Sequence, residues 1–110
     1  MKISDLLAKT GWKSLGTYCD QDREVSGVYC GDLLSWVMGR GKTDQAWVTV
    51  QVHENVIAVA LLREFSCIIL ADNASAPEEF YERAAEEQIT VIASGLPVFE
   101  TAKVLVELNI

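Results

Sequence analysis

The sequence predicts a single α/β domain built on a mostly parallel sheet flanked by helices. The chain has 110 residues, the size of one ordinary domain; 50% of them are hydrophobic and 23% are charged, which is a globular composition. From residue 46 onward, short apolar segments alternate three times with helical patterns. Strands that alternate with helices need crossover connections, and these place the strands parallel to one another in one sheet.

The first 45 residues are expected to add a helix and one or two strands to the same domain. Ser4 is a suitable N-cap for a helix through Lys9, and Gly11 suits the left-handed residue that ends such a helix. An extended segment is expected over residues 12–18. No linker rich in Pro, Gly or Ser follows, so residues 1–110 are expected to form one unit.

A second extended segment and a short helix are expected next. Residues 23–29 have the pattern of a strand. Asp32 is then expected to cap a short apolar helix over residues 33–38, which Gly39 and Gly41 end.

Three strand–helix units are expected over residues 46–110. Residues 47–52 alternate valine with other residues, which predicts a strand with one apolar face. Residues 56–65 are almost all apolar and too numerous for one strand, so they predict a buried helix. The short apolar run 67–71 is typical of a strand buried on both faces.

The last two helices are marked by prolines. Ser75 and Glu78 have the spacing of a capping box, with Pro77 tolerated in the first turn, and they predict a helix to about residue 87. The remaining expected elements are a strand over 90–93 and a helix that Pro97 opens and that ends near Leu108.

Charge and apolar content limit the partners and the location. The formal net charge is -7 and no cluster of Lys and Arg occurs, whereas nucleic acids and anionic membranes attract cationic surfaces. We therefore expect no nucleic-acid partner and no membrane partner. The longest apolar stretch, residues 56–62, is far shorter than the roughly 20 residues that span a bilayer. A cytoplasmic location is expected.

The three cysteines are expected to be reduced thiols. Cys19, Cys30 and Cys67 are an odd number, so they cannot all pair within one chain. Cys30 and Cys67 have apolar neighbours in the sequence, and burial in a core is the expected fate of both thiols.

The candidate site lies in the loops that follow the expected strands. Ligands of open parallel sheets bind beyond the carboxyl ends of the strands, where helix N-termini attract anions. The residues of these loops that we single out as candidate ligand-binding residues are Asp32, His53, Glu54, Asn55, Asp72, Asn73, Ser94 and Gly95.

His53, the only histidine, has two interpretations. Beside Glu54 it could act as a general base or bind a ligand near neutral pH. Alternatively, His53 is an exposed residue at a helix start, and Asp72 and Asn73 are ordinary turn residues.

Known catalytic motifs are incomplete. Gly41-Lys42-Thr43 resembles the end of a phosphate-binding P-loop, but Trp36 stands where that motif needs a glycine. The sequence contains no G-x-G-x-x-G run and no Cys-x-x-Cys pair. No metal site and no cofactor are expected.

Two long runs carry a family resemblance. Residues 27–39, GVYCGDLLSWVMG, and residues 47–60, WVTVQVHENVIAVA, resemble the small stand-alone proteins of the DRTGG-domain family. The Asp-Arg-Thr-Gly-Gly signature itself is absent. If its parts correspond to the loops after the first two strands of residues 46–110, Glu54-Asn55 and Ala71-Asp72-Asn73 stand in their place. The resemblance implies a fold like the N-terminal domain of HPr kinase/phosphorylase, without the kinase domain. It also implies a regulatory or assembly role, which in this family is associated with hydrogenase and sensor-kinase genes.

These observations lead to one leading hypothesis and two alternatives. The leading hypothesis is a non-catalytic regulatory or ligand-sensing module that takes a small molecule or nucleotide. It is expected to form a homodimer, because the family resemblance and the apolar segment with Trp36 and Met38 suit a subunit contact. The first alternative is a small enzyme with His53 as general base, oriented by Glu54 or Asp72. The second alternative is a pure protein-interaction subunit.

Overall fold

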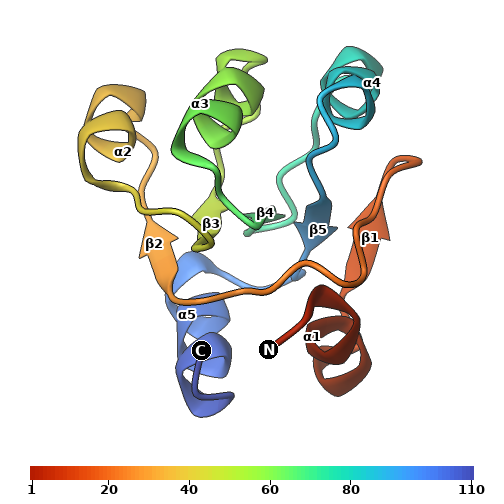
Figure 1. Ribbon diagram of the computed structural model, residues 1–110, viewed down its shortest axis with the longest axis vertical. Coiled ribbons are helices and arrows are strands. Elements are labelled where there is room, and N and C mark those ends of the chain that lie inside the picture. The colour runs from red at the N-terminus through yellow and green to blue at the C-terminus, as the bar shows by residue number, and fades with distance from the viewer.

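Four parallel strands lie side by side in the order in which the chain makes them. The computed structural model describes all 110 residues, and its five-stranded sheet has the order β1-β5-β4-β3-β2 (Figure 1). Strands β2 to β5 are parallel, and β1 is antiparallel to β5. The expected mostly parallel α/β fold is therefore confirmed. The strands are β1 (Lys13–Leu15), β2 (Val28–Cys30), β3 (Ala46–Thr49), β4 (Cys67–Leu70) and β5 (Val91–Ala93).

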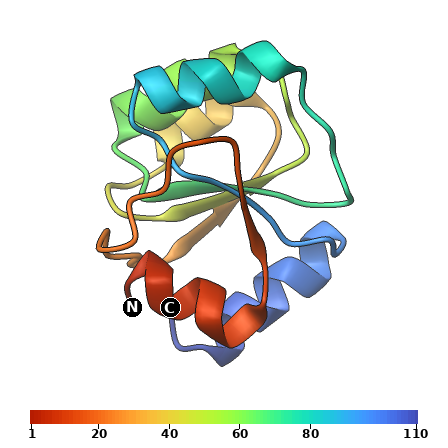
Figure 2. The same ribbon diagram turned by 90° about the vertical axis from the view of Figure 1, so that its right-hand side faces the viewer.

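Helices cover both faces of the sheet. Helices α2, α3 and α4 form one layer, and α1 and α5 form the other (Figures 1 and 2). None of the five helices is both long and apolar enough to cross a membrane. The helices are α1 (Ile3–Thr10), α2 (Leu34–Arg40), α3 (Asn55–Arg63), α4 (Glu78–Glu86) and α5 (Val98–Glu107).

The sheet separates two hydrophobic cores. Trp47 of β3 belongs to the core beneath α2, α3 and α4, together with Ile68 and Phe80. Val48, the next residue, belongs to the opposite core beside Ile3 and Leu105. All four residues of β3 are buried, so the expectation of a single apolar face for this strand is wrong. The reason is that helices shield both faces of the parallel strands, as β-α-β crossovers require.

The expected helix caps are the main local errors. Ser4 lies inside α1, whose first N–H groups bind a distant loop instead. The Ile3 N–H donates to the Arg23 carbonyl and the Ser4 N–H donates to the Gln21 carbonyl, both at 3.0 Å. A tertiary contact thus replaces the side-chain cap. The predicted end of α1 is confirmed, because Gly11 has a φ of 73° and its N–H donates to the Leu7 carbonyl.

Two other expected caps also differ from the structure. Helix α2 begins after Leu33, and Asp32 binds the neighbouring strand loop instead of capping it. Helix α4 begins at Glu78 after an extended Pro77, so Ser75 caps nothing. A proline disfavours helical backbone in the residue before it, which delays the start of this helix.

Candidate functional site

The loops at the carboxyl ends of the strands form two linked pairs. The first pair follows β2 and β3, and Asp32 joins its members. The Asp32 carboxylate accepts hydrogen bonds from the Thr49 hydroxyl at 2.6 Å and from the Val50 N–H at 2.9 Å. Thr49 is fully buried, so this contact anchors an exposed carboxylate to the end of the core strand β3.

The second pair of loops follows β4 and β5. The Asp72 N–H donates to the Leu96 carbonyl at 2.8 Å. A Cβ atom on Gly95 would lie 3.8 Å from Oδ1 of Asn73, so these two loops are close neighbours. Asp72 and Asn73 both have left-handed backbone, with φ of 56° and 54°. Asp and Asn tolerate this conformation better than most residues.

The Ser94 side chain forms hydrogen bonds with residues at the start of α5. Its side chain is buried and shares a hydrogen bond of 2.8 Å with the Thr101 hydroxyl. Ser94 Oγ also accepts from the Leu96 N–H at 3.2 Å, and the Thr101 hydroxyl donates to the Pro97 carbonyl at 2.9 Å. These bonds join the end of β5 to the first turn of α5.

His53 lies at the start of α3, with its side chain exposed. Its Nδ1 accepts a hydrogen bond from the Asn55 N–H at 3.1 Å, which is the geometry of a side chain that supports a helix start. Glu54 is exposed and its carboxylate makes no capping bond. No hydrogen bond joins His53 to Glu54 or to Asp72, the two carboxylates considered as orienting partners.

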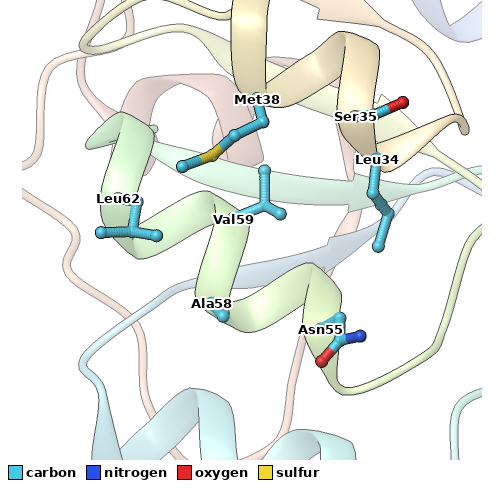
Figure 3. A pocket seen from close by; sticks show the side chains of 7 residues that line it. All are labelled: Leu34, Ser35, Met38, Asn55, Ala58, Val59 and Leu62. Atoms are coloured by element: carbon cyan, nitrogen blue, oxygen red, sulfur yellow. The ribbon is translucent and has the colours of Figure 1, made fainter.

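A groove lies between α2 and α3, beginning at the loop edge and continuing along both helices. Its volume is about 320 Å³. Met38 extends from α2 towards Val59 and Leu62 of α3, and Asn55 stands at one end (Figure 3). The groove is lined mainly by apolar side chains, and its lining residues are Leu34, Ser35, Met38, Asn55, Ala58, Val59 and Leu62.

Large apolar side chains surround this groove at the surface. Leu62 is 60% exposed, Trp36 on α2 is 55% exposed, and Leu33, the residue before α2, is 61% exposed. The Arg40 guanidinium carbon lies 4.1 Å from the centre of the Trp36 ring. Ser35 lines both the groove and a second hollow beside Trp36, so the two hollows are neighbours. We call the outer surface of these two helices the α2/α3 face.

The structure revises the expectation that residues 56–65 form a buried helix. The helix exists as α3, but only Val56, Ile57 and Ala60 on it are buried. Leu61 and Leu62 are exposed because α3 belongs to an outer layer, which has one side towards solvent. Because α3 is apolar nearly all round, its solvent side carries apolar side chains.

Charge is distributed unevenly along the α2/α3 face. Helices α2 and α3 contain no acidic residue and each ends with an arginine, Arg40 and Arg63. Acidic residues stand just before both helices, Asp32 before α2 and Glu54 before α3. The exposed Glu64 follows Arg63 directly, so the C-terminal end of α3 carries charges of both signs. The face is therefore acidic before both helices, apolar in the middle, and basic at the C-terminal end of α2, where the exposed Lys42 follows Arg40.

The cysteines differ in exposure. Cys67 is fully buried in β4, as expected, and burial raises its pKa to about 12. The expectation of a buried Cys30 is wrong: this residue is exposed because it ends β2, the edge strand of the sheet. Partial burial of the thiol and the nearby Asp32 carboxylate both raise the pKa of Cys30. No group of three or more His, Cys, Asp or Glu residues is arranged to hold a metal ion.

No protein-family model matches the chain, and no curated protein matches it.

Proposed function

We propose that this protein is a non-catalytic regulatory module that acts by binding another protein surface through the α2/α3 face. The observation that carries the proposal is the apolar groove between α2 and α3, bordered by the exposed side chains of Leu62 and Trp36. Exposed apolar surface gathered around a groove is typical of interaction sites, whereas single exposed apolar residues are ordinary.

The residue types on this face support a protein contact. Trp, Met and Arg are enriched at the centres of interfaces, and Trp36, Met38 and Arg40 lie on one short helix. Arg40 stacks on the Trp36 ring, so an incoming surface would meet both an apolar plane and a fixed positive charge. The groove itself carries few polar groups that could orient a small ligand.

A matched pair of leucine variants on α3 tests the proposal. Leu62 lines the groove, whereas Leu61 is exposed on the side of α3 away from it. The wild type, Leu62→Glu and Leu61→Glu would be used as baits in extracts of the native source, with bound proteins quantified by mass spectrometry. A protein retained by the wild type and Leu61→Glu but lost with Leu62→Glu supports the proposal. If both variants retain the same proteins as the wild type, the α2/α3 face is not the binding surface.

The family resemblance supports a regulatory role and is itself a proposal. The two runs that resemble DRTGG-domain proteins, residues 27–39 and 47–60, supply β2, most of α2, most of β3 and the first two-thirds of α3. They therefore include most of the α2/α3 face. A cytoplasmic location, with reduced thiols, belongs to the same proposal.

Ligand sensing at the loop edge is the second candidate function. It is favoured by the consecutive left-handed residues Asp72 and Asn73 beside Gly95, since uncommon backbone conformations cluster at functional sites. A thermal-shift screen against nucleotides and common metabolites tests this candidate, because a ligand of the folded state raises the melting temperature. A shift that Asn73→Gly abolishes would support it. A panel without any shift would count against it.

A further inference from the structure

The charges of the α2/α3 face make it complementary to itself. Asp32 and Glu54 stand at the N-terminal end of the two helices, and Arg40 and Arg63 stand at the C-terminal end, where the exposed Glu64 follows Arg63. Lys42 adds a further exposed positive charge beyond Arg40. A surface with this pattern attracts a copy of itself only when the copy is turned end for end, so that acidic ends meet basic ends.

We propose that the α2/α3 face binds a second copy of this chain, with the helices of the two copies antiparallel across a two-fold axis. The inference rests on the proposed function, because it names the surface that the α2/α3 face would bind. An isologous contact uses the same patch on both copies, and the apolar middle of this patch is flanked by charges of opposite sign.

The direction of the helices defines the arrangement. Helices α2 and α3 each connect neighbouring parallel strands, so they run in the same direction. A two-fold axis across the helices places α2 against α2 and α3 against α3, each pair antiparallel. Asp32 then faces the Arg40 and Lys42 end of the second copy, which provides the charge complementarity, whereas Glu54 faces an end where Arg63 and Glu64 offset each other. An axis along the helices would instead bring like charges together at both ends.

Antiparallel packing also suits the helix dipoles and the shape of the face. Each helix end carries a partial charge, positive at the N-terminus and negative at the C-terminus, and antiparallel neighbours place opposite partial charges together. Leu62 projects beside the groove, and two-fold symmetry gives each copy one such side chain and one such groove. Projecting side chains of one helix that enter the groove of another are the usual mode of helix packing.

The size of the face predicts a weak, concentration-dependent dimer. Helices of 7 and 9 residues are only about 10 and 14 Å long. The area they offer falls below the roughly 800 Å² per partner of a standard interface. We therefore expect a weak dimer that forms at high protein concentration and dissociates on dilution.

Sedimentation velocity over about 10 µM to 1 mM tests the stoichiometry and the surface. We expect the wild type and Leu61→Glu to move from monomer to dimer over this range, and Leu62→Glu to stay monomeric. The dissociation constant should rise severalfold when salt is raised from about 0.05 to 0.5 M, because exposed charge pairs are screened. A monomeric wild type at 1 mM, or a dimer that Leu62→Glu leaves intact, would overturn the inference.

Disulfide trapping tests the orientation of the two copies. In a Cys30→Ser background, Ala58→Cys places a thiol in the groove near the middle of α3, and Glu54→Cys places one before its first turn. Antiparallel packing brings the two central residues together and separates the two Glu54 positions by about 15 Å along the helix. We expect Ala58→Cys to form a disulfide-linked dimer under mild oxidation and Glu54→Cys to form much less. The reverse result would contradict antiparallel packing.

The two proposals fail in different ways. If the wild type is monomeric but captures a protein that Leu62→Glu does not capture, the inference of a homodimer is overturned and the proposed function stands. A dimer that dissociates with Leu62→Glu would support the inference even if no other protein is captured. If Leu62→Glu changes neither self-association nor capture, both proposals are wrong.

Discussion

Asp32 Oδ1 accepts a hydrogen bond of 2.6 Å from the Thr49 hydroxyl and thereby joins two loops whose residues are 17 positions apart in the chain. The same oxygen accepts from the Val50 N–H at 2.9 Å. Since Thr49 is fully buried, its hydroxyl depends on protein partners for its hydrogen bonds. The ends of β2 and β3 are thus held together by a side chain outside any helix or strand.

Replacing Asp32 by alanine should therefore destabilise the domain. We expect Asp32→Ala to lower the free energy of unfolding by about 1–3 kcal/mol, because the Thr49 hydroxyl and the Val50 N–H lose their acceptor. Urea denaturation measures this loss. Asp22→Ala is the control, since the Asp22 side chain is 90% exposed and only makes a surface ion pair of 3.7 Å with Lys2. Equal losses in the two variants would contradict a special role for Asp32.

Gly39 and Gly41 should respond oppositely to alanine. A Cβ atom on Gly41 would overlap the Phe65 ring and lie 3.0 Å from the Val37 carbonyl oxygen, whereas a Cβ on Gly39 meets nothing within 4 Å. We expect Gly41→Ala to cost about 1–3 kcal/mol through overpacking. Gly39→Ala should instead stabilise the protein by about 0.5–1 kcal/mol, because Gly39 lies inside α2. Thermal unfolding should show a lower melting temperature for Gly41→Ala and a higher one for Gly39→Ala than for the wild type. A stabilised Gly41→Ala would refute the packing argument.

The charge of Asp32 should slow the alkylation of Cys30. Partial burial and the Asp32 carboxylate raise the pKa of the Cys30 thiol, so less of the reactive thiolate is present near neutral pH. Asp32→Asn keeps an oxygen acceptor for Thr49 but removes the charge. We expect this variant to react about two to five times faster with iodoacetamide at pH 8, as measured by mass spectrometry of the modified peptide. An unchanged rate would mean that the Asp32 carboxylate does not affect the thiol.

Cys67 should make the protein sensitive to alkaline pH. Burial raises the pKa of its thiol from 9.0 to about 12, so between these values the folded state holds a proton that the unfolded state has released. The stability contribution is complete below pH 9 and is lost as the pH rises towards 12. The melting temperature should therefore fall more steeply over this range for the wild type than for Cys67→Ala. Parallel curves for the two proteins would show that Cys67 does not cause the loss.

His53 should contribute to the start of α3 through its Nδ1 acceptor. We expect His53→Ala to lower the free energy of unfolding by about 0.5–1 kcal/mol, and His53→Asn to keep most of it, because asparagine can accept the same Asn55 N–H bond. Chemical denaturation compares the two variants. If the protein proves to turn over a substrate and His53→Asn abolishes that activity without changing stability, the general-base alternative would be favoured over this structural role.

Much of the fold could be predicted from local patterns. The apolar run that became β4 and the glycine that ends α1 have short-range causes, so the sequence was sufficient to locate them. The helix starts were harder to predict. Ser4 and Ser75 have the right chemistry for caps, but a backbone contact from Gln21 and the extended backbone at Pro77 decide where those helices begin.

The candidate site was predictable in position but not in its contacts. The pairing of Asp32 with Thr49 follows from the parallel neighbours β2 and β3, and no local pattern marks a buried threonine as the partner of an exposed carboxylate. The groove between α2 and α3 depends on which helices pack side by side in the outer layer. The apolar run of α3 showed that apolar side chains had to be buried somewhere, but the run alone could not show that Leu62 would remain exposed.

The antiparallel pairing of β1 with β5 has a consequence for how the chain folds. Units β2–α2 through β4–α4 connect neighbours in the sheet, so each can dock as soon as the next strand is present. Lys13 pairs with Ala93, however, and α1 packs into the same core as Leu105 of α5. Strand β1 must therefore wait for β5, which the chain makes after the other four strands. Long-range contacts of this kind slow folding, so the closure of β1 onto β5 is expected to be a late event in folding.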